Sequence, residues 1–225
     1  MGPTEAWLAV GLAAAVMLAL GIGVVAAQRR ARIGALMSAH GWVRSRRDDT
    51  TTITAGDDSW AVEITRSFAS QQSPPSTHIV TSTWTDAAPR RSSLALVAGP
   101  SPPPEMRDIA ISAFAALPGR LKGWLGMTRP VAGAGLQIAE EVDPRLLAFV
   151  TEGQAHATGS LTAMADAVDT WCGNYGRERE QPAVSLNAEG IQIRVRVDVS
   201  RSPAQLSAFV DLGRRCRAAL SDIGT

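Results

Sequence analysis

The stretch 191-IQIRVRVDV-199 is the strongest β-strand signal in this sequence of 225 residues. Isoleucine and valine occupy every second position, and glutamine, arginine and aspartate fill the positions between them. Alternation with period two is typical of a strand that buries one face and exposes the other. The turn residues 187-NAEG-190 precede it, and the run 183–186 lies before the turn. These residues predict a β-hairpin.

A helix is predicted directly after this hairpin. Ser202 is a favourable N-cap, Pro203 suits the first helical turn, and apolar residues then recur at helical spacing up to Leu220. Residues 146–150 fit a buried strand or part of a helix equally well, because so short a run has no decisive period. Further helices are predicted over 105–117 and after Ser160, and further strands over 50–54, 60–65, 78–84, 92–98 and 136–138.

The order of these elements indicates the α+β class. Strands joined by tight turns, without regular helical crossovers, predict antiparallel sheet(s) covered by helices on one face. We expect a soluble α+β domain over residues 42–225, with possible halves over 42–119 and 131–225.

The N-terminal residues predict a transmembrane helix. Residues 6–27 carry no charged or strongly polar side chain. As a helix they would span about 33 Å, enough for a hydrocarbon core of about 30 Å. We therefore expect residues 1–28 to be the signal-anchor of a single-pass membrane protein and residues 29–41 to form a basic juxtamembrane helix. A cleaved signal peptide is the alternative, but the leader has no Lys or Arg and the apolar core is too long.

Arginines follow the apolar segment at once and are absent before it. This asymmetry predicts that the N-terminus is out and that the soluble domain lies on the cytoplasmic side of a bacterial inner (plasma) membrane. Trp7 suits the outer interface, and a stripe of small residues would allow the helix to self-associate into a homo-oligomer. The predicted anchor residues are Ala6, Trp7, Gly11, Ala15, Ala19, Gly23 and Ala27. The predicted contacts to lipid head groups are Arg29, Arg30, Arg32, Arg44, Arg46 and Arg47.

Composition and motifs argue against several classes of function. A net charge of +1 gives no concentrated basic surface, so we expect no nucleic acid partner. Cys172 and Cys216 are too few and too far apart for a disulfide scaffold or a zinc site, and they fall on apolar helix faces. The segment Gly133-Ala134-Gly135 lacks the third glycine and the preceding strand of a dinucleotide loop. We expect no cofactor, no metal site and no catalytic motif.

These observations favour a membrane-anchored protein whose α+β domain binds another protein or a small ligand without catalysis. One alternative is a structural subunit of a larger membrane-associated assembly. Another is an enzyme with an unrecognised site, for which the polar candidates are His78, His156, Asp143, Arg194 and Arg196. The last two share the polar face of the strand over 191–199, where they would form an anion-binding ridge or a solvated surface.

Overall fold

The predicted hairpin lies near the centre of the sheet. In the computed structural model, β8 (Ala183–Asn187) pairs antiparallel with β9 (Gly190–Val195). Strand β9 ends before the sequence alternation does. The hydroxyl of Ser82 donates to the carbonyl of Val197 and accepts from the backbone N–H of Val199. The chain therefore leaves the sheet after Val195 and turns into the short 3₁₀ helix η2 (Val199–Arg201).

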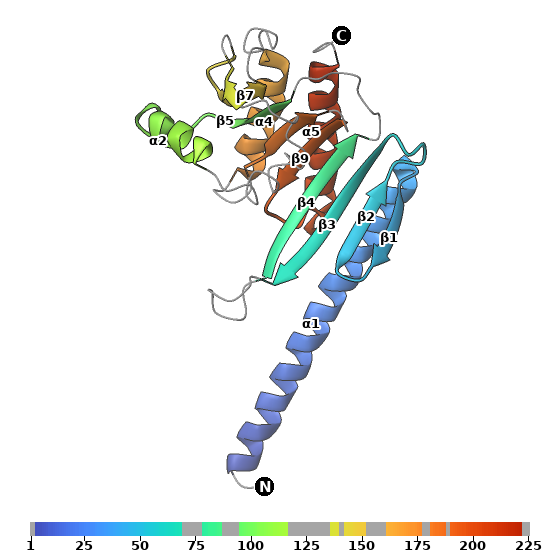
Figure 1. Ribbon diagram of the computed structural model, residues 1–225. Coiled ribbons are helices and arrows are strands. Elements are labelled where there is room, and N and C mark those ends of the chain that lie inside the picture. Colours follow the sequence, from blue (N-terminus) through green and yellow to red (C-terminus); the bar gives the residue numbers. More distant parts are fainter. Residues whose placement is uncertain are drawn as a thin grey trace.

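The other strands extend this hairpin into one antiparallel sheet of nine strands, in the order β1-β2-β3-β4-β9-β8-β5-β7-β6 (Figure 1). Strand β4 pairs with β9, so strands from 42–119 and from 131–225 lie in the same sheet. Residues 146–150, undecided from sequence, are strand. The further strands are β1 (Val43–Arg47), β2 (Thr50–Thr54), β3 (Trp60–Phe68), β4 (His78–Asp86), β5 (Leu96–Pro100), β6 (Leu136–Ile138) and β7 (Leu146–Thr151).

The structure describes residues 3–68, 78–86, 95–116, 136–139, 142–151, 161–176, 181–187 and 190–221, and it describes only the backbone of residues 3–16, 18, 68 and 78. Within these ranges lie the helices α1 (Pro3–His40), α2 (Pro104–Ala115), α4 (Thr162–Tyr175) and α5 (Pro203–Leu220). Helices and a large antiparallel sheet together confirm the α+β class. The predicted cap Ser160 and the segment 133–135 lie outside the described residues.

Helices α4 and α5 pack side by side against one face of the sheet (Figure 1). The ring of Trp171 in α4 lies 5.5 Å from that of Phe209 in α5, and both side chains are buried. The last turns of α1 join the same core through Ile33 and Met37. Nearly all of the buried apolar side chains in the described ranges belong to this one core.

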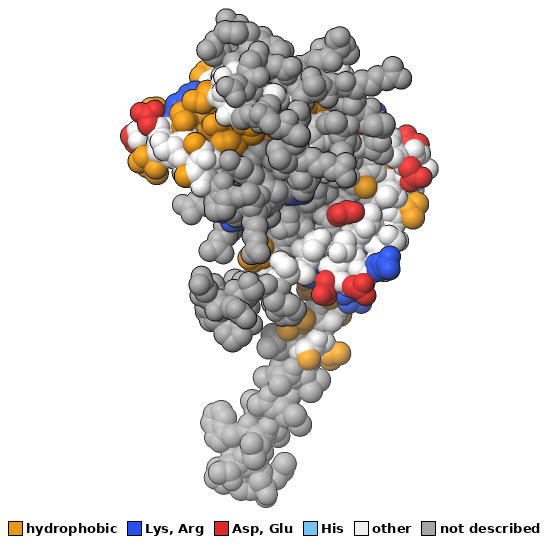
Figure 2. All heavy atoms as spheres, in the orientation of Figure 1, with side chains coloured by type: hydrophobic (Ala, Val, Ile, Leu, Met, Phe, Trp, Pro, Cys, Tyr) orange, Lys and Arg blue, Asp and Glu red, His pale blue; other side chains and the backbone are white. Residues whose placement is uncertain are grey.

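Helix α2 packs differently and has no fully buried side chain. Phe114 stacks on Phe149 of β7, with ring centroids 3.7 Å apart and planes at 11°. Met106 and Ile109 are largely exposed, and apolar side chains gather over this helix in Figure 2. Its predicted apolar face is therefore covered by described residues mainly at one end.

The prediction of a transmembrane anchor is wrong, since no helix within the described residues is both long and apolar enough to cross a membrane. The description of the chain as a single-pass membrane protein with a signal-anchor is corrected accordingly.

Helix α1 runs without a break through the segments predicted over 1–28 and 29–41. It extends away from the sheet, with the N-terminus at its far end (Figure 1). It ends before Gly41, whose φ of 66° is a left-handed conformation that glycine adopts without a Cβ penalty. Among its described side chains, the large apolar ones that are exposed are Met17, Leu20, Ile22, Val24 and Val25.

Candidate functional site

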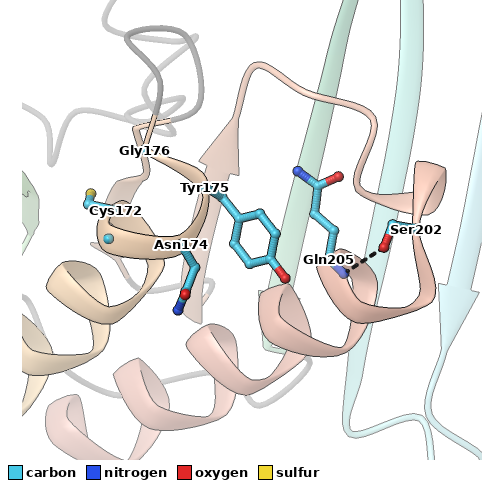
Figure 3. Close-up of a pocket in the computed structure, with 7 residues that line it drawn as sticks. Cys172, Asn174, Tyr175, Gly176, Ser202 and Gln205 are labelled. Carbon is cyan, nitrogen blue, oxygen red and sulfur yellow. Dashed lines mark hydrogen bonds between the residues drawn. The ribbon is translucent and has the colours of Figure 1, made fainter.

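A pocket of about 460 Å³ lies where the last turn of α4 meets the first turn of α5 (Figure 3). The two helices pack against each other, and the pocket between these two turns is open to solvent. The residues that line it are Cys172, Gly173, Asn174, Tyr175, Gly176, Ser202 and Gln205. Each of these residues lies in one of the two helices or caps one of them.

The first turn of α5 is fixed by its capping residues. Pro203 occupies the first position, where its fixed φ suits a helix and its missing N–H leaves no donor unpaired. The hydroxyl of Ser202 accepts a hydrogen bond from the backbone N–H of Gln205 at 3.4 Å. This cap leaves the side chain of Gln205 free to point toward α4.

Gln205 is the most unusual residue of the pocket. Its side chain is only 8% exposed, and no described residue donates a hydrogen bond to its amide or accepts one from it. In Figure 3 the amide points away from α5 into the space beside Tyr175 and Ser202. The amide still reaches solvent through the open pocket, since neither of its polar atoms is among the fully buried atoms that lack a hydrogen-bond partner. The amide is therefore an unused pair of donor and acceptor groups at the wall of the pocket.

The last turn of α4 supplies the opposite wall. The half-buried ring of Tyr175 lies 4.8 Å from that of Trp171, and its hydroxyl points toward the start of α5 in Figure 3. The side chain of Asn174 points away, and its Nδ2 donates to the carbonyl of Thr170. The backbone N–H of Gly176 closes the helix by donating to the carbonyl of Cys172 at 2.7 Å. Tyr175 thus faces Gln205 across the pocket.

The described lining of the pocket carries no Lys, Arg, His, Asp or Glu side chain. The thiol of Cys172 stays protonated, because burial and the nearby carboxylate of Asp169 raise its pKa. The described lining therefore offers neutral hydrogen-bonding groups and an aromatic ring.

A network of polar side chains holds the turn that leads into α5. The buried carboxylate of Asp198 accepts from Arg66 at 3.0 Å and from both the N–H and the hydroxyl of Ser200. Burial raises the pKa of Asp198, but the hydrogen bonds from Ser200 and Arg66 lower it by a larger amount. The pKa of this carboxyl group therefore lies below its usual value. Arg29 of α1 donates to the carbonyl of Ser200 at 3.1 Å. The position of Ser202 is thus tied to β3 and to α1.

The arginines predicted as lipid contacts lie on two elements. Arg29, Arg30 and Arg32 belong to α1, where Arg29 bonds to Ser200, and the others belong to the exposed strand β1. In the anchor stripe, Ala19, Gly23 and Ala27 are exposed on α1, whereas the side chains of Ala6, Trp7, Gly11 and Ala15 lie outside the described residues. None of these residues lines the pocket, and their contacts with lipid or with a second copy stay predictions.

The candidates for an unrecognised enzyme do not come together in the described structure. Asp143 pairs with Arg145 at 2.9 Å, and this hydrogen-bonded guanidinium lowers its pKa to about 2. Burial lowers the pKa of Arg194 in β9, while Arg196 is exposed and lies one residue past the end of this strand. The side chain of His78 and all of His156 lie outside the described residues. No three His, Cys, Asp or Glu side chains within the described ranges could hold a metal ion.

Comparison with known proteins adds no relative: no family model, no curated protein and no solved structure matches this chain. The pocket itself was not predicted from the sequence, although one signal was present. Gln205 stands at helical spacing before Phe209 and Gly213, and it therefore occupies the apolar stripe of α5. A polar residue in such a stripe indicates a buried side chain that needs a hydrogen-bond partner.

Proposed function

We propose that this chain is a binding protein whose α+β domain takes a small polar ligand in the pocket between α4 and α5. The observation that carries the proposal is the amide of Gln205, which is nearly buried, aimed into the pocket and without a partner among the described residues. A ligand that bonds to this amide would replace the solvent that reaches it through the open pocket. The volume of about 460 Å³ falls in the range of about 300–1,000 Å³ that is usual for small-molecule sites.

Binding without catalysis is supported by the chemistry of the lining. A nucleophile needs a lowered pKa or a base within hydrogen-bond reach, whereas the pKa of Cys172 is raised. Gln205, Ser202 and Tyr175 are groups that position a ligand. A protein partner, a role as a subunit of a larger assembly and an enzyme site outside the described residues stay predictions.

The proposal is tested by NMR on the full-length chain labelled with ¹⁵N. The side-chain NH₂ signals of Gln205 are assigned as those that disappear in Gln205→Leu. We expect members of a library of neutral, amide-bearing small molecules to shift these signals in a saturable manner. The matched control is Gln192 of β9, which lies on the sheet face opposite the helices, and whose signals are assigned with Gln192→Leu.

Two outcomes decide the proposal. Saturable shifts at Gln205, with Gln192 unaffected, support a ligand site between α4 and α5. If no compound in the library moves the Gln205 signals at millimolar concentration, the pocket is not a site for small polar ligands and the proposal fails.

A further inference from the structure

We infer that the pocket takes a planar, uncharged heterocycle that presents a hydrogen-bond donor and an acceptor side by side, the chemistry of a nucleobase or its nucleoside. This inference rests on the proposed function and names the class of ligand for the same site. Three features of the described lining support it: its lack of charge, the free amide of Gln205 and the aromatic ring of Tyr175.

The described lining favours an uncharged ligand, because it offers no opposite charge to receive a charged one. Charged ligands are expensive to remove from water unless an opposite charge or several strong hydrogen bonds receive them. No cationic or anionic side chain stands among the described residues that line the pocket. A base or nucleoside meets this condition, whereas the phosphates of a nucleotide would have to remain in solvent.

The geometry of the amide selects the shape of the ligand. The carboxamide of Gln205 presents its C=O and its N–H on one edge and in one plane. A trans peptide bond directs its own N–H and C=O to opposite sides, so it cannot pair with both groups at once. The edge of a nucleobase does present a donor next to an acceptor, which is how glutamine pairs with N6 and N7 of adenine.

The aromatic ring supplies the second kind of contact. Tyr175 faces the amide across the pocket in Figure 3 and is braced by Trp171 behind it, at 4.8 Å. Flat rings stack on such a side chain through dispersion and burial of apolar area, and one base stacked on an aromatic residue contributes about 1–3 kcal/mol in single-stranded nucleic acid complexes. An aliphatic amide would use Gln205 but would lose this contact.

The test is a titration of the ¹⁵N-labelled full-length chain with adenosine, guanosine, cytidine and uridine, with the NH₂ signals of Gln205 as the readout. We expect at least one nucleoside to shift them to saturation. Among matched ligands, purine riboside, which lacks the exocyclic amino donor of adenosine, is expected to bind about tenfold more weakly than adenosine if adenosine is the ligand. If a nucleoside other than adenosine binds best, the matched ligand is the analogue of that nucleoside with a methyl group on its donor nitrogen.

Protein variants separate the two contacts. Gln205→Leu and Gln205→Met are expected to weaken nucleoside binding by about tenfold, measured by calorimetry, while Gln192→Leu leaves it unchanged. Tyr175→Phe keeps the ring and most of the affinity, whereas Tyr175→Leu loses about tenfold or more. Melting temperatures of all variants are compared first, so that a loss of binding is not a loss of fold.

The outcomes distinguish this inference from the proposed function. If no nucleoside moves the Gln205 signals but aliphatic amides do, the inference is overturned while the binding function stands. If no compound of any class moves them, both fail. Equal nucleoside affinity in the wild-type protein and in Gln205→Leu also overturns the inference, because the amide would then make no contact.

Discussion

Helix α5 meets its surroundings in two different ways along its length. In its second half, Gly213 lies against the indole of Trp84 so closely that no Cβ would fit, and Cys216 and Leu220 are fully buried. In its first turn, Gln205 borders a pocket of about 460 Å³ and finds no partner among the described residues. One helix thus combines a tightly packed half with an end that borders an open pocket.

The contrast separates residues that stabilise the fold from residues that are available to a ligand. Protein interiors are close-packed, and buried polar groups are nearly always hydrogen-bonded. The second half of α5 is close-packed, although Nε1 of Trp84 beside Gly213 is buried without a hydrogen-bond partner among the described residues. The first turn instead borders an open pocket. An open pocket with polar groups in its wall is expected where binding rather than stability sets the choice of residue.

Gly213→Ala tests the packed half and is expected to have the largest effect. Alanine normally stabilises a helix by about 1 kcal/mol relative to glycine. Here its Cβ would lie 2.6 Å from Nε1 of Trp84 and in contact with two ring carbons. Because the indole is rigid and fully buried, we expect the free energy of unfolding to fall by about 3 kcal/mol. Urea unfolding followed by tryptophan fluorescence measures this change.

The matched control is Gly34→Ala in α1, where a Cβ would meet no atom within 4 Å. This substitution is expected to raise the free energy of unfolding by about 0.5–1 kcal/mol. If Gly213→Ala were as harmless as Gly34→Ala, the second half of α5 would not be tightly packed, and the comparison between the two parts of the helix would lose its basis.

Asp198→Asn tests the network that positions the first turn of α5. The substitution removes a charged acceptor from Arg66 and Ser200, and we expect a loss of about 2 kcal/mol in unfolding free energy at pH 7. The pKa of Asp198 is lower in the folded protein, so its contribution is complete above the pKa of an unfolded aspartate, about 3.9. As pH falls below about 4, this contribution is lost and the difference between wild type and variant should shrink.

The control for this prediction is Asp211→Asn, also on α5. Asp211 pairs with Arg215 at 2.9 Å, but both side chains are more than half exposed, and such pairs contribute at most a few tenths of a kcal/mol. Urea unfolding of both variants between pH 7 and pH 3 gives the comparison. A difference between wild type and Asp198→Asn that stays constant over this range would contradict the role of the ionised carboxylate.

Much of the fold could be predicted where one face of an element is buried and the other exposed. Strand β9 and helix α5 were predicted for this reason. Strand β1 was not, because its residues 43-VRSRR-47 are all exposed at the edge of the sheet. Charged residues are common on edge strands, where they oppose further pairing. The pairing of Arg46 with Thr51 and the left-handed turn at Asp48 specify this strand instead.

Other features depend on tertiary contacts that no local pattern contains. Strand β7 was ambiguous because it is apolar on both faces. Ala148 and Val150 belong to the main core, while Phe149 stacks on Phe114 of α2. The packing of α4 on α5 brings Tyr175 and Gln205 to the same pocket. No local sequence pattern specifies this packing. Gln205 by itself could have been noticed, because it interrupts the apolar stripe of α5.

Gln205→Leu tests the open end of α5 and is expected to have the smallest effect on stability. Leucine is close to glutamine in size and removes an amide that has no partner among the described residues. We therefore expect the free energy of unfolding to stay the same or to rise by up to about 1 kcal/mol. The same urea unfolding experiment, at pH 7 and without added ligand, measures it.

The sign of this change decides what the first turn of α5 is for. A residue selected for stability should lose stability on substitution, as Gly213 is expected to do, whereas a residue selected for binding should not. Gln192→Leu, on the opposite face of the sheet, gives the background effect of replacing a half-buried glutamine. A loss of about 2 kcal/mol or more in Gln205→Leu would mean that the amide stabilises the empty protein. The two parts of α5 would then serve the same purpose, and the argument for a ligand in this pocket would be withdrawn.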